Sequence, residues 1–165
     1  MADGESPPLR ANTPLLSLFL MVCIKRLFAL GKKYPFPRPS TCLRCGSPRI
    51  WGHGFKDAYY DGYNSALPQK RYICAECQCV YTLRPFGYWP RHHASATVIL
   101  GSICRRIQEG AWKSDTLLSR QRRQHWLRAL IRNVKSYLGM DFEGDPMEGF
   151  YELVHQDRIP VARAG

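Results

Sequence analysis

Cys42-Leu43-Arg44-Cys45-Gly46 and Cys74-Ala75-Glu76-Cys77 are the two stretches of this 165-residue chain that decide its fold. A Cys-x-x-Cys turn presents two sulfurs to one metal ion, and two such turns complete the tetrahedral shell that Zn²⁺ favours. The 28 residues between the turns suit a pair of strands that returns the second turn to the first. The sequence therefore predicts one structural zinc ion, whose ligands are Cys42, Cys45, Cys74 and Cys77.

Other uses of the cysteines fit the pattern less well. The chain has seven cysteines, an odd number, and a redox pair needs only one Cys-x-x-Cys motif beside a βαβ unit that is not visible here. Two disulfides and unbound thiols stay open as alternatives. Cys79, His53, His92 and His93 are further candidate ligands, although four thiolates already saturate a structural zinc ion. Because a closed shell leaves no position for water, we expect no enzyme.

Residues 41–90 are expected to form a zinc ribbon. Residues 49–60 and 71–83 are rich in aromatic and β-branched side chains, and Asp61, Gly62 and Asn64 lie between them. This pattern predicts a hairpin or a small three-stranded antiparallel sheet. Such a ribbon buries too little apolar surface to be stable alone, and metal binding contributes about 10 kcal/mol or more in comparable modules.

The N-terminal part is expected to contain a disordered leader at 1–12, an apolar helix at 13–31 and a proline-rich connector at 32–40. The apolar run 15–24, which includes one serine, is followed by Lys25 and Arg26. It offers roughly half of the length that crosses a bilayer, so we expect no membrane span. The helix is instead expected to pack on the body, or to bind a transposase, another protein or a second copy of the chain.

Two helices are predicted in residues 91–140, in an arrangement like a helix-turn-helix pair. The first begins after Ser95 and stops at Gly110, and the second begins after Ser119 and stops at Gly139. At about 100° per residue, one arc of the second helix is apolar and the opposite side is cationic. The apolar arc comprises Leu127, Leu130, Ile131, Val134 and Leu138, and the cationic side comprises Arg122, His125, Arg128 and Arg132.

Charge is distributed unevenly along the chain. The net charge is +11, and residues 84–135 hold eleven basic residues against two acidic ones. Residues 141–165 carry six acidic and two basic residues and are expected to form an acidic tail. In that tail Phe150, Tyr151, Leu153 and Val154 can dock onto the body. The expected fold class is thus α+β: a small antiparallel zinc ribbon, then a basic helical segment, with an N-terminal apolar helix on the body.

Double-stranded DNA is the partner that this charge distribution favours. A strongly basic field attracts polyanions, and guanidinium groups bind phosphates and guanine edges in two-point contacts. A solvated charged face is the alternative for the helix, and aromatic side chains that stack on single-stranded nucleic acid are another. The expected DNA-binding residues are Arg120, Gln121, Arg122, Gln124, His125, Arg128, Arg132 and Lys135.

Several short segments together resemble a bacterial family of short, mobile-element-associated proteins. These segments are Pro35-Phe36-Pro37-Arg38-Pro39, the turn Cys42 to Gly46, Trp51-Gly52-His53-Gly54, Arg71-Tyr72-Ile73-Cys74 and Arg123-Gln124-His125-Trp126-Leu127. The family is similar to the zinc-ribbon and helix-turn-helix heads of insertion-sequence transposases. The resemblance implies an accessory or orphan DNA-binding module that is cytoplasmic and nucleoid-associated. The chain has no room for the RNase H-like domain with which such transposases cut DNA.

A second function from another class stays open. A zinc-stabilised adaptor that binds protein or RNA, without sequence-specific DNA binding, accounts for the ribbon and for the apolar N-terminal segment. A metal-dependent enzyme needs water on the metal, and a membrane-surface protein needs affinity for lipid vesicles. These two are weaker alternatives on the same residues.

Overall fold

The computed structural model describes residues 15–163, with side chains from residue 17 onward. The predicted leader at 1–12 lies outside these residues. The chain divides into two compact units, an N-terminal unit up to His93 and a C-terminal unit from Ala94. Strands are confined to the first unit, and the second is helical. The structure thus confirms the α+β class.

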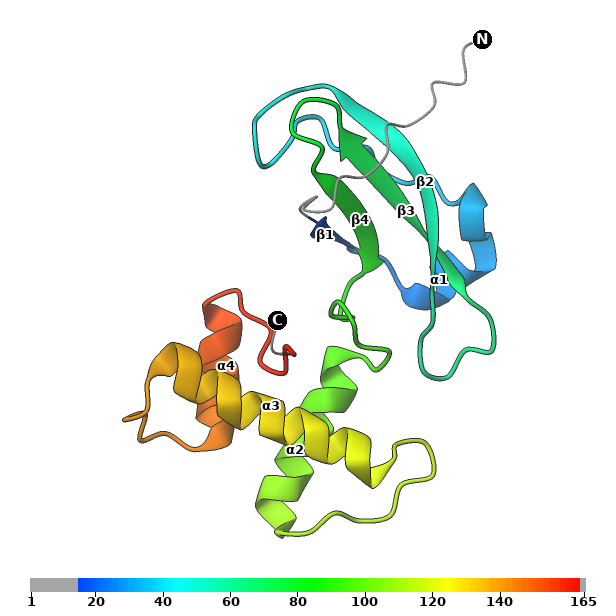
Figure 1. Ribbon diagram of the computed structural model, residues 1–165. Coiled ribbons are helices and arrows are strands. Elements are labelled where there is room, and N and C mark those ends of the chain that lie inside the picture. Colours follow the sequence, from blue (N-terminus) through cyan, green and yellow to red (C-terminus); the bar gives the residue numbers. More distant parts are fainter. Residues whose placement is uncertain (1–14, 164–165) are drawn as a thin grey trace. The chain divides into compact units, whose positions relative to one another are not determined.

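A four-stranded sheet forms the body of the N-terminal unit (Figure 1). Its strands are β1 (Leu15–Leu20), β2 (Ile50–Ala58), β3 (Leu67–Cys74) and β4 (Val80–Pro85). They lie in the order β1-β4-β3-β2, and β3 is antiparallel to both β2 and β4. The antiparallel part, β2, β3 and β4, matches the predicted three-stranded sheet. The sheet has one strand more than expected, because β1 adds to β4 in parallel.

The predicted apolar helix at 13–31 is wrong in its first half. Residues Leu15–Leu20 form β1, and a helix, α1, begins only at Ile24 and ends at Leu30. A short continuous apolar run fits a buried strand as well as a helix, so periodicity alone does not separate them. The edge of β4 favours the strand, since it offers backbone partners to residues 15–20. Gly31 ends α1 as predicted, with a φ of 52°.

The outer strand β2 is irregular. Its register against β3 shifts between Gly52 and Phe55, and Gly54 between them has a φ of 64°. A glycine with positive φ is the usual centre of such a β-bulge. The bulge therefore interrupts the regular hydrogen-bonding ladder in the middle of β2.

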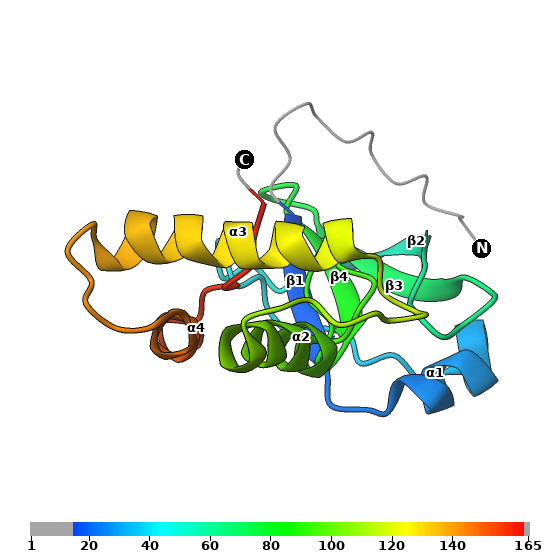
Figure 2. The ribbon, with the colours of Figure 1, turned by 90° about the horizontal axis from the view of Figure 1, so that it is seen from below.

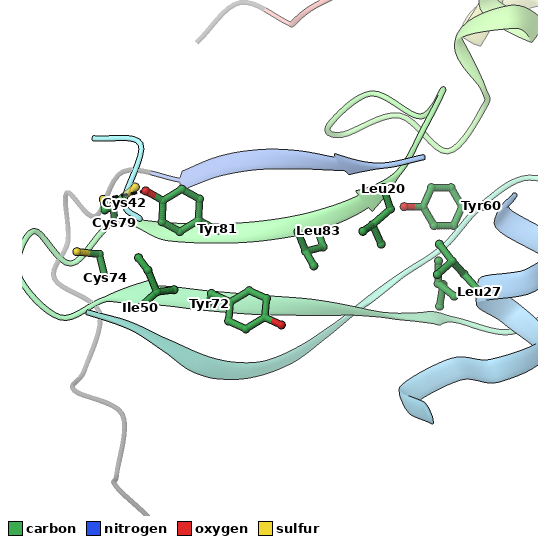
Figure 3. Close-up of a cluster of buried hydrophobic side chains, with 11 residues drawn as sticks. Leu20, Leu27, Cys42, Ile50, Tyr60, Tyr72, Cys74, Cys79, Tyr81 and Leu83 are labelled. Carbon is green, nitrogen blue, oxygen red and sulfur yellow. Dashed lines mark hydrogen bonds between the residues drawn. The ribbon is translucent and has the colours of Figure 1, made fainter. Parts of the chain in front are cut away.

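One face of the sheet carries the main hydrophobic core of the N-terminal unit (Figure 3). Cys42, Cys74 and Cys79 lie at one end of this core, and Leu27 of α1 lies at the other. Phe28 of α1 also stacks on Tyr63, with 4.0 Å between ring centroids. The core is therefore closed by α1 at one end and by the cysteine turns at the other.

The C-terminal unit contains the helices α2 (Ala96–Glu109), α3 (Arg120–Leu138) and α4 (Pro146–His155). Ser95 and Ser119 are N-caps as predicted, because each side chain accepts a hydrogen bond from the amide three residues later. Gly110 ends α2 in the left-handed conformation, also as predicted. In Figure 2, α2 and α4 lie on the same side of α3. None of the helices in residues 15–163 is long and apolar enough to span a bilayer.

The predicted acidic tail is largely a packed helix. Asp145 and Glu148 form a capping box that starts α4, so two of the acidic residues serve the helix N-terminus. Phe150 and Leu153 are buried, as predicted for docking residues, whereas Tyr151 and Val154 are exposed. Residues 160–162 are also anchored: the buried Asn133 of α3 donates hydrogen bonds to the carbonyls of Pro160 and Ala162, at 2.9 and 3.1 Å.

The contact between α3 and α4 requires a glycine at position 149. A Cβ atom on Gly149 of α4 would lie 2.5 Å from Cγ2 of Val134 on α3. We predict that Gly149→Ala lowers the free energy of unfolding by about 1–3 kcal/mol through overpacking, measured by urea denaturation. Adding Val134→Ala should recover part of that loss. A single substitution without effect would show that α3 and α4 are further apart.

Candidate metal centre and nucleic-acid interface

Four cysteine sulfurs converge at one end of the sheet. The Sγ atoms of Cys42, Cys45, Cys74 and Cys77 all lie within 4.8 Å of one another. Two of the separations are 3.5 Å (Cys42–Cys77) and 3.6 Å (Cys45–Cys74). A tetrahedral shell with Zn–S bonds of about 2.3 Å has edges of about 3.8 Å, so the four sulfurs fit a single ion. They are too far apart for disulfides, and all seven cysteines are free thiols.

Two backbone turns of the same design position the sulfurs. In the first knuckle, residues 42–47, the amides of Gly46 and Cys42 donate to the carbonyls of Cys42 and Ser47. In the second knuckle, residues 74–79, the amides of Gln78 and Cys74 donate to the carbonyls of Cys74 and Cys79. The residue after each second cysteine has positive φ, 74° at Gly46 and 59° at Gln78. The sequence indicated this conformation at Gly46 but not at Gln78.

The electrostatics of the cluster suit a cation. Burial raises the pKa of Cys42, but hydrogen bonds from the Tyr81 hydroxyl and from two amides of the first knuckle outweigh it and lower the pKa to about 6. Burial raises the pKa of Cys77 to about 12, and the neighbouring cysteines add to that effect. Four thiolates at this spacing repel one another unless a positive ion lies between them. The donor set therefore fits a soft divalent metal ion.

Tyr81 is a member of the site that sequence reasoning did not assign. Its hydroxyl lies 2.8 Å from Sγ of Cys42 and accepts a hydrogen bond from the amide of Leu43 at 2.9 Å. The side chain is fully buried on β4 and points at the first knuckle (Figure 3). It therefore orients a candidate ligand from outside the cluster. Its place in a strand gave no signal, because tyrosine is common in strands.

The other candidate ligands lie outside the cluster. Among residues 15–163, the group that can hold a metal contains only the four cysteines of the two Cys-x-x-Cys turns. Cys79 is buried at the end of the second knuckle, where its carbonyl accepts a hydrogen bond from the amide of Cys74. The imidazole Nδ1 of His53 is buried without a hydrogen-bond partner. His92 and His93 instead line a separate concavity in the same unit.

The predicted DNA-binding residues divide into two groups along α3. Arg120, Gln121, His125, Arg128 and Lys135 are exposed, and Gln124 is partly exposed. At about 100° per residue these six side chains fall within an arc of about 140°. Glutamate and aspartate are absent from α3. One side of the helix is therefore mainly polar and cationic, and it is here called the cationic face.

Arg122 and Arg132 form the second group, because both are partly buried and their guanidinium groups contact other residues of the unit. The guanidinium of Arg122 lies 5.1 Å from the ring centroid of Trp126. Arg132 donates a hydrogen bond to the carbonyl of Ala162 at 2.6 Å. Arg132 thus anchors the C-terminal segment, a contact that the sequence pattern did not indicate.

The buried face of α3 also differs from the predicted apolar arc. Leu130 and Val134 are buried, but Ile131 is 39 % exposed. The buried face instead includes the polar residues Arg123 and Asn133. Arg123 donates to the carbonyl of Lys113 at 2.8 Å. The buried side of α3 differs from the predicted arc because Arg123 and Asn133 donate hydrogen bonds to backbone carbonyls. The pattern of apolar residues alone does not predict these bonds.

The fold and the cluster define a class: an α+β protein in which one unit has a four-cysteine site able to hold one metal ion, and the other unit is helical and has a cationic face. Comparison with family models, curated proteins and solved structures gave no match.

The cluster makes a direct prediction about metal content. Cys74→Ser should lose the bound metal and most of the β-sheet circular dichroism signal, because Cys74 is buried within the cluster. Cys79→Ala should keep the metal, because its side chain lies outside the cluster. Native mass spectrometry counts the bound ions in both proteins. Equal metal content in the two variants would contradict this assignment.

A second prediction concerns Tyr81. Tyr81→Phe removes the hydroxyl that bonds to Cys42 and leaves the Leu43 amide without its acceptor. Losing a hydrogen bond between a metal ligand and a residue that is not itself a ligand typically weakens metal binding by about 10- to 100-fold. Competition against a chromophoric chelator measures the change. Tyr72→Phe is the matched control, since its hydroxyl donates to the Phe36 carbonyl away from the metal site. An unchanged metal affinity in Tyr81→Phe would remove this residue from the site.

Proposed function

We propose that the protein is a zinc-stabilised DNA-binding protein. Zinc is the ion that a shell of four thiolates favours, and its closed tetrahedral geometry suits a structural role. Such an ion stabilises the N-terminal unit by joining its two knuckles and needs no exchangeable position. The support is the convergence of the four sulfurs within 4.8 Å.

The observation that carries DNA binding is the cationic face of α3. Arg120, Arg128 and Lys135 are exposed there, with no carboxylate on the same helix. Exposed guanidinium and ammonium groups along one helix face neutralise phosphates in succession, and Gln121, Gln124 and His125 add groups that can bond to base edges. The length of α3, from Arg120 to Leu138, suits the major groove of double-stranded DNA.

The biological setting that we propose is an accessory or orphan module of a mobile element. Its basis is the sequence resemblance to the DNA-binding heads of insertion-sequence transposases. One feature departs from a simple helix-turn-helix: residues 110–119 connect α2 to α3, where that motif has a turn of about three or four residues. The proposal therefore relies on the cationic face and not on a particular helix pair.

The salt dependence of binding tests the cationic face. Arg128→Ala with Lys135→Ala should lower the slope of log affinity against log salt by about one to two on duplex DNA. Fluorescence anisotropy at several salt concentrations measures the slope. The matched control is Lys25→Ala with Arg26→Ala, which removes two exposed positive charges from α1. Equal slopes in the two double variants would reject the assignment of this face.

Arg132→Ala separates a structural arginine from a DNA-binding one. It should lower the free energy of unfolding by about 1–3 kcal/mol, because the Ala162 carbonyl loses its charged donor. It should change the salt slope less than Arg128→Ala does.

Selection from a random duplex library, with and without chelator, then tests whether binding is sequence-specific and metal-dependent.

A further inference from the structure

A second concave site lies in the N-terminal unit, apart from the metal centre. It encloses about 200 Å³ where the end of β2 meets β3, β4 and the segment 91–93. Its lining carries a net positive charge, because three cationic side chains and two histidines accompany one carboxylate. The charged and imidazole side chains in the lining are Lys56, Asp57, Arg84, Arg91, His92 and His93.

Arg84 is the innermost of these cations. It is partly buried on β4, where Nε donates a hydrogen bond to the Ser17 hydroxyl at 3.0 Å, and the guanidinium also bonds to the Tyr60 hydroxyl. Within residues 15–163, no carboxylate forms an ion pair with it. A charge that is partly removed from water and has only neutral partners is stabilised by a counter-ion.

Tyr60 adds a donor beside this arginine. Its hydroxyl oxygen accepts a hydrogen bond from the buried Gln69 and also bonds to Arg84, and the side chain is only 4 % exposed. An oxygen that accepts two hydrogen bonds keeps its own proton to offer to a further acceptor. An acceptor from a ligand would complete the arrangement.

The segment that closes the concavity is held in an uncommon backbone conformation. Arg91 has a φ of 66°, which is rare for a residue other than glycine. The carbonyl of His93 accepts a hydrogen bond from the amide of Asp61, and the amide of His92 donates to the carbonyl of Trp89. These bonds fix the backbone next to the lining residues, so the site is preformed.

We propose that this concavity binds a phosphate group, held by Arg84, Arg91, Lys56 and the Tyr60 hydroxyl. A phosphate supplies both the negative charge and the several acceptor oxygens that these donors need. The choice of nucleic acid as the source of the phosphate rests on the proposed function, whereas free phosphate ion offers the same chemistry. The site adds to the proposed function a phosphate contact in the N-terminal unit that is independent of α3.

The test follows backbone amides of the zinc-loaded full chain by NMR. Three probes are titrated separately: inorganic phosphate, a single-stranded hexanucleotide with a 5′-phosphate, and the same hexanucleotide with a 5′-hydroxyl. The proposal expects the largest shifts at residues 56–60 and 91–93 with at least one probe. A response to the first probe alone supports free phosphate, a preference for the 5′-phosphate supports a chain end, and equal response to both oligonucleotides supports an internal phosphodiester. No saturable shifts at these residues with any probe would overturn the proposal.

Variants connect the shifts to the named side chains. Arg84→Gln should weaken binding of the responding probe by about tenfold or more. Because Arg84 also bonds to Ser17 and Tyr60, the pair Lys56→Gln and Arg91→Asn provides an independent variant that leaves those contacts intact. Asparagine tolerates the left-handed backbone at residue 91. The matched control is Arg26→Gln, exposed on α1 and outside the lining.

Asp57→Asn gives the opposite expectation, since removing the only carboxylate of the lining should strengthen binding by about two- to threefold. If the lining variants bind phosphate as the original chain does, the proposal fails. This outcome is separate from failure of the proposed function. Loss of duplex binding through α3 would leave the phosphate response of residues 56–60 and 91–93 in place, and the reverse result would leave the cationic face in place.

Discussion

The N-terminal unit depends on four converging sulfurs, which repel one another as thiolates and which can share one cation. The two knuckles come from distant parts of the chain, and their sulfurs approach to 3.5 Å. Without a cation, thiolates at this distance drive the knuckles apart, and with one they become the strongest link in the unit. The first knuckle leads into β2, and the second joins β3 to β4. An ion bound there would therefore fix the register of three strands at their common end, and Tyr81 ties β4 to the same point.

The helical unit follows a different constraint, the division of α3 into a buried and an exposed side. Contacts with α2 and α4 occupy one side, including a polar pair, Arg123 and Asn133, that bonds to backbone carbonyls. The other side is left with side chains that have no carboxylate partner on the helix. The same residues that could not be buried thereby become available to a polyanion. The side of α3 that packing leaves exposed is therefore also the side that carries the positive charge.

Local signals were readable from the sequence, and non-local ones were not. The caps Ser95 and Ser119, the stop at Gly110 and the turn within each Cys-x-x-Cys pair depend on neighbours within a few residues, so their patterns were sufficient. The convergence of the two pairs was predicted from the four ligands that a zinc ion requires. The strand β1 depends on the free edge of β4, more than sixty residues away in sequence. Tyr81, Arg132 and the phosphate concavity depend on contacts that only the folded chain creates. The DNA-binding and phosphate-binding roles stay predictions.

The bulge in β2 has a consequence for behaviour at high concentration. An outer strand with a regular row of amides and carbonyls recruits the same strand of another molecule, which leads to aggregation. The shift between Gly52 and Phe55 breaks that row in the middle of β2. Together with the repulsion expected between chains of charge +11, the break favours separate molecules over edge-to-edge stacks.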